Sequence, residues 1–136
     1  MPSNKPYIHN PKIEVRRSKL HGLGVFANAN IKKGEILEEC HFILDKTPFH
    51  KIKNPLQAYI FAWGNKDPDN KSKSAIVFGY GCIYNSSENN NATWETDKRK
   101  NKFIFYAVKN IKKGEEITTN YGNDYWESRN MSKKNK

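Results

Sequence analysis

Residues 30–35 (NIKKGE) and residues 110–115 (NIKKGE) are two copies of one segment. Each copy lies between two short apolar runs, which are residues 24–26 (GVF) and 36–37 (IL) for the first copy, and residues 103–106 (FIFY) and 117–119 (ITT) for the second. A Lys-Gly turn between such runs is typical of a β-hairpin, because glycine adopts positive φ and lysine stays solvated. Two copies are too few for a solenoid. We therefore predict two similar hairpins at opposite ends of one β-rich domain.

Three stretches between the copies have recognisable local patterns. Residues 54–63 (NPLQAYIFAW) predict a short helix, with asparagine as the N-cap and proline at the first helical position. Residues 66–74 (KDPDNKSKS) have the composition of an exposed loop. Residues 74–84 (SAIVFGYGCIY) are β-branched and aromatic, and they predict a buried strand bent at its two glycines. The polar residues 85–91 (NSSENNN) follow this strand directly.

The composition is that of one globular domain. Of its 136 residues, 36% are hydrophobic, with seven Phe, seven Tyr and three Trp, which exceeds what a disordered chain carries. No apolar run approaches the ~20 residues that span a bilayer, and the polar N-terminus lacks a signal-peptide core, so we expect neither a membrane segment nor secretion. Cys40 and Cys82 are too few for a disulfide framework or a tetrahedral zinc site. They indicate a reducing compartment, the nucleus or the cytoplasm, and imply no metal.

The net charge of +10 has two interpretations. A basic chain can bind the phosphates of nucleic acid. Alternatively, lysine and asparagine are abundant because the coding DNA is rich in A and T, and the lysines are solvated surface.

Three candidate motifs are weak when each is taken alone. Residues 21–24 (HGLG) form a Gly-x-Gly pattern, which more often than not is only a turn. Asn85 follows an apolar run, where asparagine is usually a turn former. Tyr121 would ordinarily be a packed aromatic residue with a satisfied hydroxyl group. None of these motifs assigns a function without the others.

Their order along the chain, however, resembles the SET domain of protein-lysine methyltransferases. Residues 18–27 (SKLHGLGVFA) resemble the opening of that domain, and residues 81–87 (GCIYNSS), with the later Asn91-Ala92, resemble its Asn-His-Ser…Pro-Asn-Ala segment. Residues 114–122 (GEEITTNYG) resemble its closing motif. The resemblance extends from about Lys12 to Arg129 and is closest to the minimal SET histone methyltransferase of a large algal virus.

This resemblance implies a fold and a domain organisation. The fold is mainly β, a β-clip of small sheets with one or two short helices. The segments that contain Asn85 and Tyr121 form a knot-like crossing in it. The SET domain would occupy residues 12–129, between an N-terminal extension (residues 1–11) and a basic C-terminal tail (residues 130–136).

The resemblance also implies an activity, the S-adenosylmethionine-dependent methylation of lysine in a histone tail. The viral likeness favours the Ala-Arg-Lys-Ser context of histone H3, with transcriptional silencing as the outcome, in the nucleus of a host cell if the chain is viral. Two alternatives stay open, a methyltransferase of a non-histone protein and a SET-fold binding module that has lost catalysis. If the substrate is a histone, the basic surface would also contact nucleosomal DNA.

By the same resemblance, individual residues receive roles. The catalytic residues would be Tyr121, whose hydroxyl group orients the amine and the methyl group, and Tyr59, a second wall of the lysine channel. The cofactor-binding residues would be His21, Gly22, Leu23, Gly24, Asn85, Ser86, Tyr121, Tyr125 and Trp126. The substrate-binding residues would be Phe78, Gly79, Tyr80 and Thr119, the first three on a strand to which the peptide adds.

The sequence departs from the family pattern in a few places. Ser86 stands where the family usually has histidine, and Asn90 where it has proline, so the loop that holds the cofactor lacks its usual brace. Thr119 replaces the Phe or Tyr that often tunes the number of methyl groups. The chain has no cysteine-rich post-SET segment, and we expect a second copy to cover the channel in a homodimer, with contacts near Trp126 and Arg129.

Overall fold

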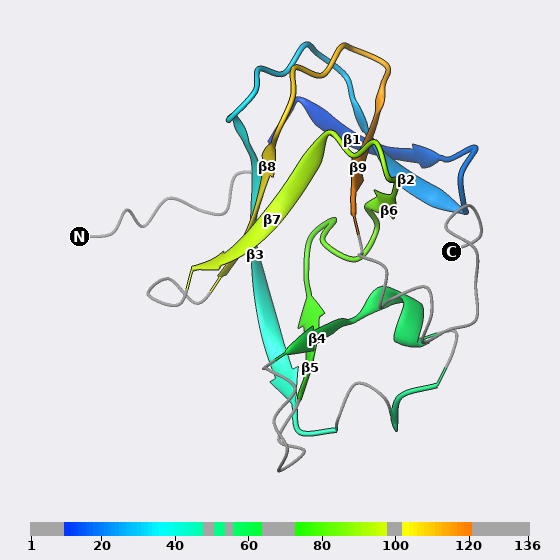
Figure 1. The fold of residues 1–136 in the computed structure, drawn as a ribbon, viewed down its shortest axis with the longest axis vertical. Helices are drawn as coiled ribbons and strands as arrows, with labels where there is room; N and C mark the ends of the chain where they lie inside the picture. Colours follow the sequence, from blue (N-terminus) through cyan, green and yellow to red (C-terminus); the bar gives the residue numbers. More distant parts are fainter. Residues whose placement is uncertain (1–9, 48–50, 54–55, 64–72, 98–101, 121–136) are drawn as a thin grey trace.

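The computed structural model describes residues 10–47, 51–53, 56–63, 73–97 and 102–120, and Figure 1 shows that these residues build two curled sheets. The four-stranded sheet has the order β1 (Ile13–Arg17), β2 (Leu23–Ala27), β9 (Glu116–Thr119) and β6 (Asn85–Ser86). The five-stranded sheet has the order β4 (Phe61–Trp63), β5 (Lys73–Val77), β3 (Ile36–Asp45), β8 (Lys102–Ala107) and β7 (Ala92–Asp97). The short 3₁₀-helix η2 (Leu56–Tyr59) precedes β4. The prediction of a mainly β fold is confirmed.

The two NIKKGE copies do not form the predicted hairpins. β2 pairs with β9 and β3 pairs with β8, so each copy connects a strand of one sheet to a strand of the other. The copies also lie side by side, in contrast to the predicted opposite ends: the backbones of Ile31 and Ile111 exchange two hydrogen bonds of 2.8 Å. The Gly34 amide donates to Ala107 and the Gly114 amide donates to Ala27, so the exchange is symmetric. A hairpin would leave Ile31 and Ile111 at separate surfaces, whereas here both are 1% exposed.

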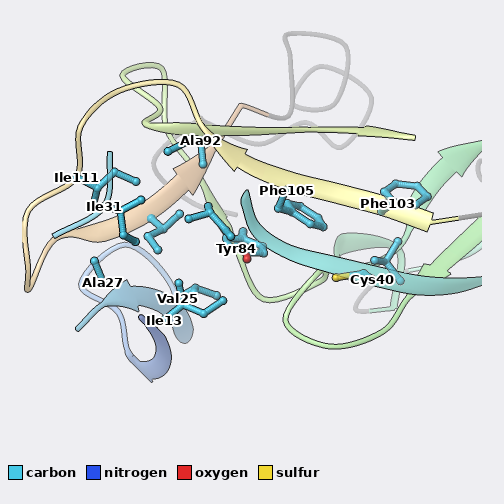
Figure 2. Close-up of a cluster of buried hydrophobic side chains, with 14 of the residues drawn as sticks. Ile13, Val25, Ala27, Ile31, Cys40, Tyr84, Ala92, Phe103, Phe105 and Ile111 are labelled. Atoms are coloured by element: carbon cyan, nitrogen blue, oxygen red, sulfur yellow. The ribbon is translucent and has the colours of Figure 1, made fainter. Parts of the chain in front are cut away.

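One hydrophobic core joins the two sheets. Figure 2 shows Ile31 and Ile111 together at one end of a cluster that extends to Phe103 and Cys40. Between these ends the rings of Tyr84 and Phe105 stack with their centroids 4.5 Å apart. Phe105 belongs to β8 of the five-stranded sheet, and Tyr84 directly precedes β6 of the four-stranded sheet, so this ring contact joins the two sheets.

The predicted helix over residues 54–63 is mostly wrong. The observed helix is one turn, Leu56–Tyr59, and Phe61 begins a strand that pairs with β5. Phe61 contacts the rings of Trp94 and Phe103, with centroids 5.1 Å from each, so tertiary packing outweighs the local helix signal. The expected caps at residues 54 and 55 lie outside the described residues.

The predicted strand over residues 74–84 is right only in its first half. β5 ends at Val77, and the chain then turns through residues 78–83, with hydrogen bonds from Gly81 to Phe78 and from Ile83 to Tyr80. Gly79 has a φ of 70°, which a side chain would oppose, and a Cβ at Gly81 would overlap Val77. The two glycines therefore end the strand where the sequence had suggested a bend.

Candidate functional site

A hydrogen-bond network around Asn85 joins segments that are far apart in the sequence. The Asn85 side chain is buried, and its Nδ2 group lies 3.1 Å from the His21 carbonyl and 3.0 Å from the Leu23 carbonyl. The same nitrogen lies 2.8 Å from the Glu116 carboxylate. Two N–H bonds thus serve three acceptors. The network fixes the loop before β2 against β6 and β9. It brings together His21, Leu23 and Asn85, which the family resemblance assigns to one cofactor site, and that role stays a prediction.

Glu116 and Ser18 complete this network, and neither was predicted to act in it. The Ser18 hydroxyl group donates to Glu116 over 2.6 Å and accepts the Leu20 amide over 2.9 Å. The internal repeat contains a signal for Glu116: Glu35 matches Glu115, but Glu116 matches the apolar Ile36. That departure from the repeat marks a carboxylate with a separate role.

Two glycines shape the loop in different ways. A Cβ at Gly24 would overlap the Glu116 carboxylate and lie 3.0 Å from Asn85 Nδ2, so this position admits no side chain while the network is intact. Gly22 has a φ of 45°, and no described residue lies within 4 Å of where its Cβ would be. The backbone at Gly22 is therefore open to a ligand from outside.

The parallel pair β6–β9 places Ser86 beside Thr119. Asn85 aligns with Thr118 and Ser86 with Thr119, and the Ser87 amide donates to the Thr119 carbonyl over 2.8 Å. Both Ser86 and Thr119 are buried. The structure therefore brings together a predicted cofactor residue and a predicted substrate residue.

Two asparagines in the polar segment after β6 stabilise this arrangement. The Asn91 side chain donates to the Glu116 carbonyl and accepts the Thr118 amide, both over 2.9 Å, which holds β9 in place. Asn90, at the position where the family has proline, donates to the Ala92 carbonyl over 2.9 Å. Asn90 thus closes a local turn through its side chain, whereas proline would do so through its ring.

The predicted substrate segment rests on a buried carboxylate that sequence reasoning did not single out. Glu38, 4% exposed, accepts the Tyr84 hydroxyl group over 2.7 Å and the Tyr80 amide over 3.3 Å. Above it, Phe78 and Gly79 are exposed. Burial raises the pKa of the nearby Cys40 thiol, and the Glu38 charge raises it further, so this thiol remains protonated.

The remaining predicted residues divide into two groups. Tyr59 ends η2 and is 40% exposed, on an element separate from the Asn85 network. Tyr121, Tyr125 and Trp126 lie outside the described residues, as does Arg129 of the predicted dimer contact. Their roles, including the crossing with the Asn85 segment, stay predictions.

Two other features are absent from the described residues. No group of three or more His, Cys, Asp or Glu side chains in these ranges is arranged to hold a metal ion. In the same part of the chain, no helix has the length and apolar character needed to cross a membrane.

Comparisons with known proteins agree on one family. The model of the SET domain matches residues 22–122. A histone-lysine N-methyltransferase of Schizosaccharomyces pombe, specific for lysine 37 of histone H3, is 28% identical over 124 residues, which are 89% of this chain and 80% of that protein. A crystal structure of a Plasmodium falciparum protein, described as a candidate histone methyltransferase, is 35% identical with a TM-score of 0.66. That match covers 85% of this chain and 96% of the other.

Proposed function

The chain belongs to the SET-domain family, and from this premise we propose that it is a protein-lysine N-methyltransferase that uses S-adenosylmethionine and acts on a histone tail. The Asn85 network is the observation that supports the proposal best. It unites the three segments that carry the family motifs, and it does so through a buried side chain with three polar contacts.

The described residues fit the proposed cofactor. The exposed backbone at Gly22 leaves room for a ligand, while Asn85 holds the loop on both sides of that glycine. We assign His21, Gly22, Leu23, Gly24, Asn85 and Ser86 to its binding, with Tyr125 and Trp126 as proposed aromatic neighbours of the adenine. When bound, S-adenosylmethionine supplies an electrophilic methyl group on a positively charged sulfur.

The protein must present the substrate lysine as a neutral amine. A lysine with the ordinary pKa of about 10.4 loses its proton near pH 7.4 at a free-energy cost of roughly 4 kcal/mol. Removing the amine from water lowers its pKa and thus reduces this cost. Alignment of the two reacting groups then contributes roughly 7–11 kcal/mol. We assign the alignment to the Tyr121 hydroxyl group and the channel wall to Tyr59.

The substrate would bind along the segment that Glu38 supports. Phe78 and Gly79 offer an exposed backbone there, and a histone tail is an extended peptide able to add as a strand. The yeast relative acts on lysine 37 of histone H3, whereas the viral likeness favours the Ala-Arg-Lys-Ser context. We propose histone H3 as the target protein, with gene silencing in the nucleus as the outcome.

A tritiated-cofactor assay tests the proposal. Wild-type protein is incubated with core histones, with a lysate, and with H3 peptides that span either lysine 37 or the Ala-Arg-Lys-Ser sites. We expect labelled H3, and Tyr121→Phe should lower turnover by more than about tenfold, a barrier increase above ~1.4 kcal/mol. If only a lysate protein is labelled, the substrate is a protein other than a histone. If no protein is labelled, the chain is an inactive SET-fold module.

A further inference from the structure

The paired NIKKGE turns form a cleft that the proposed catalytic function does not use. The cleft has a volume of about 590 Å³ and is lined by residues of both copies and by Lys12. The turns are neighbours at the top of Figure 1, where β9 begins, whereas Thr119 ends that strand. This surface is thus a second feature of the molecule, distinct from the Asn85 network.

The positive charge of the described residues is concentrated at this cleft. Those residues contain fourteen Lys and Arg and ten Asp and Glu, a net charge of four. Five lysines (Lys12, Lys32, Lys33, Lys112 and Lys113) and two glutamates (Glu35 and Glu115) at the turns account for three of those four charges. The rest of the described surface is therefore close to neutral.

The acceptor groups at the turns are used internally. Glu35 accepts the Lys12 ammonium over 2.9 Å and the Lys32 amide over 3.3 Å, and Glu115 accepts the Lys112 amide over 3.1 Å. The Lys12 ion pair lowers the pKa of Glu35, so its carboxylate stays charged and in place. Both carboxylates thus have hydrogen-bond partners within the protein, although Glu115 is exposed.

The donor groups at the turns face outward. Asn110 Oδ1 accepts the Lys33 amide over 2.9 Å, and Asn30 Oδ1 accepts the Lys113 amide over 3.0 Å. Neither Nδ2 group donates to a described residue. The side chains of Lys32, Lys33, Lys112 and Lys113 are all exposed, and none of them forms a hydrogen bond or a salt bridge within the described ranges, although the charge of Lys32 attracts Glu35. Two amides and four ammonium groups therefore present only hydrogen-bond donors.

We propose that the paired turns bind the phosphate backbone of duplex DNA without regard to sequence. A small anion would meet only solvated, exposed lysines, whereas a duplex carries one charge per ~1.7 Å and engages several lysines at once. The described residues that line the cleft include no aromatic side chain on which an unpaired base could stack, which disfavours single strands. The choice of DNA over an acidic protein rests on the proposed function, because a histone tail is attached to nucleosomal DNA.

A salt titration of DNA binding tests the inference without relying on catalysis. A fluorescent duplex of about 25 base pairs is titrated with wild-type protein, with a turn variant and with a control. The turn variant carries Gln at Lys32, Lys33, Lys112 and Lys113, and the control carries Gln at four exposed cations elsewhere, Arg17, Lys46, Lys51 and Lys53. The slope of log K against log salt is negative, and each lost phosphate contact reduces its magnitude by about 0.9.

We expect the magnitude of the slope to fall by about 2–4 in the turn variant and by less than 1 in the control. At 50 mM salt the affinity of the turn variant should be at least about tenfold weaker than that of the wild type. Equal losses of slope magnitude and affinity in the two variants would overturn the inference. It would also be overturned if single-stranded RNA or polyglutamate displaced the fluorescent duplex more strongly than unlabelled duplex does.

Methylation of a free H3 peptide should be unchanged in the turn variant, and methylation of nucleosomes should be reduced. If wild-type protein methylates nothing, the proposed function fails, while the DNA titration still decides this inference.

Discussion

Alanine at Gly24 would place a methyl group where the Glu116 carboxylate now lies. The carboxylate would have to move, which would weaken its hydrogen bonds from Ser18 at 2.6 Å and Asn85 at 2.8 Å. Overpacking costs about 1–3 kcal/mol, and each lost hydrogen bond at least ~1 kcal/mol. The lower entropy of the unfolded alanine chain offsets about 0.4–1 kcal/mol. We expect the free energy of unfolding to fall by about 3 kcal/mol.

Urea unfolding of a double-mutant cycle measures this effect. Glu116→Ala removes the group that the new methyl meets, so Gly24→Ala should cost about 1–2 kcal/mol less in that background than alone. Gly22→Ala is the matched control. Its Cβ meets no described residue within 4 Å, and its cost of about 1–2 kcal/mol comes from the positive φ and should not depend on Glu116.

Additive costs for Gly24→Ala and Glu116→Ala, within about 0.5 kcal/mol, would refute this explanation of Gly24. A Gly24→Ala cost no larger than that of Gly22→Ala would refute it too. In either case the loop before β2 would have enough freedom to move away from Glu116, and the network could not be what fixes it.

Four further outcomes are expected. Ser86→His should tighten cofactor binding by restoring the usual brace, and unchanged affinity in calorimetry would mean that Asn90 and its neighbours already provide one. Thr119 is smaller than an aromatic residue, so mass spectrometry should find products beyond monomethyl-lysine. Monomethyl-lysine as the single product at long times, on saturated enzyme, would refute this. Lys12→Gln should lower the free energy of unfolding at pH 7, because Lys12 lowers the pKa of Glu35 in the folded state. The difference from the wild type should shrink as the pH falls below about 4.3, where Glu35 takes up a proton. A difference at pH 3 equal to that at pH 7 would contradict this. Light scattering should find a homodimer at assay concentrations, and a fully active monomer would exclude it.

The sequence predicted strand-rich segments well and their partners poorly. The apolar runs around the NIKKGE copies are indeed strands, because β propensity and turn-forming glycines act locally. Tertiary contacts determine that β2 pairs with β9, since a hairpin and an exchanged pair of strands have the same local sequence pattern. The helix at 54–63 failed for the same reason: Phe61 gains more from the rings of Trp94 and Phe103 than from a helical neighbour.

The site could be predicted in part, because its motifs are short and ordered. The resemblance named His21, Leu23 and Asn85 as residues of one cofactor site, and the structure brings them into hydrogen-bond contact, while their role in binding the cofactor stays a prediction. Glu116 and Glu38 were missed, because a charged residue in a strand pattern looks like solvated surface until its hydrogen-bond partners are known. Both carboxylates are held by hydroxyl groups, Ser18 for one and Tyr84 for the other, and such pairs become visible only in three dimensions.

The pairing of β2 with β9 also determines when the protein can fold during its synthesis. β2 ends at Ala27 and its partner begins at Glu116, so the ribosome must add about 90 residues, in roughly 5–18 s, before the partner exists. Throughout that interval one edge of β2 is open, beside a turn whose Ile31 has no Ile111 to cover it. The nascent chain is therefore most prone to aggregate before its last strand leaves the ribosome, and slower translation of the C-terminal third would lower the yield of folded protein.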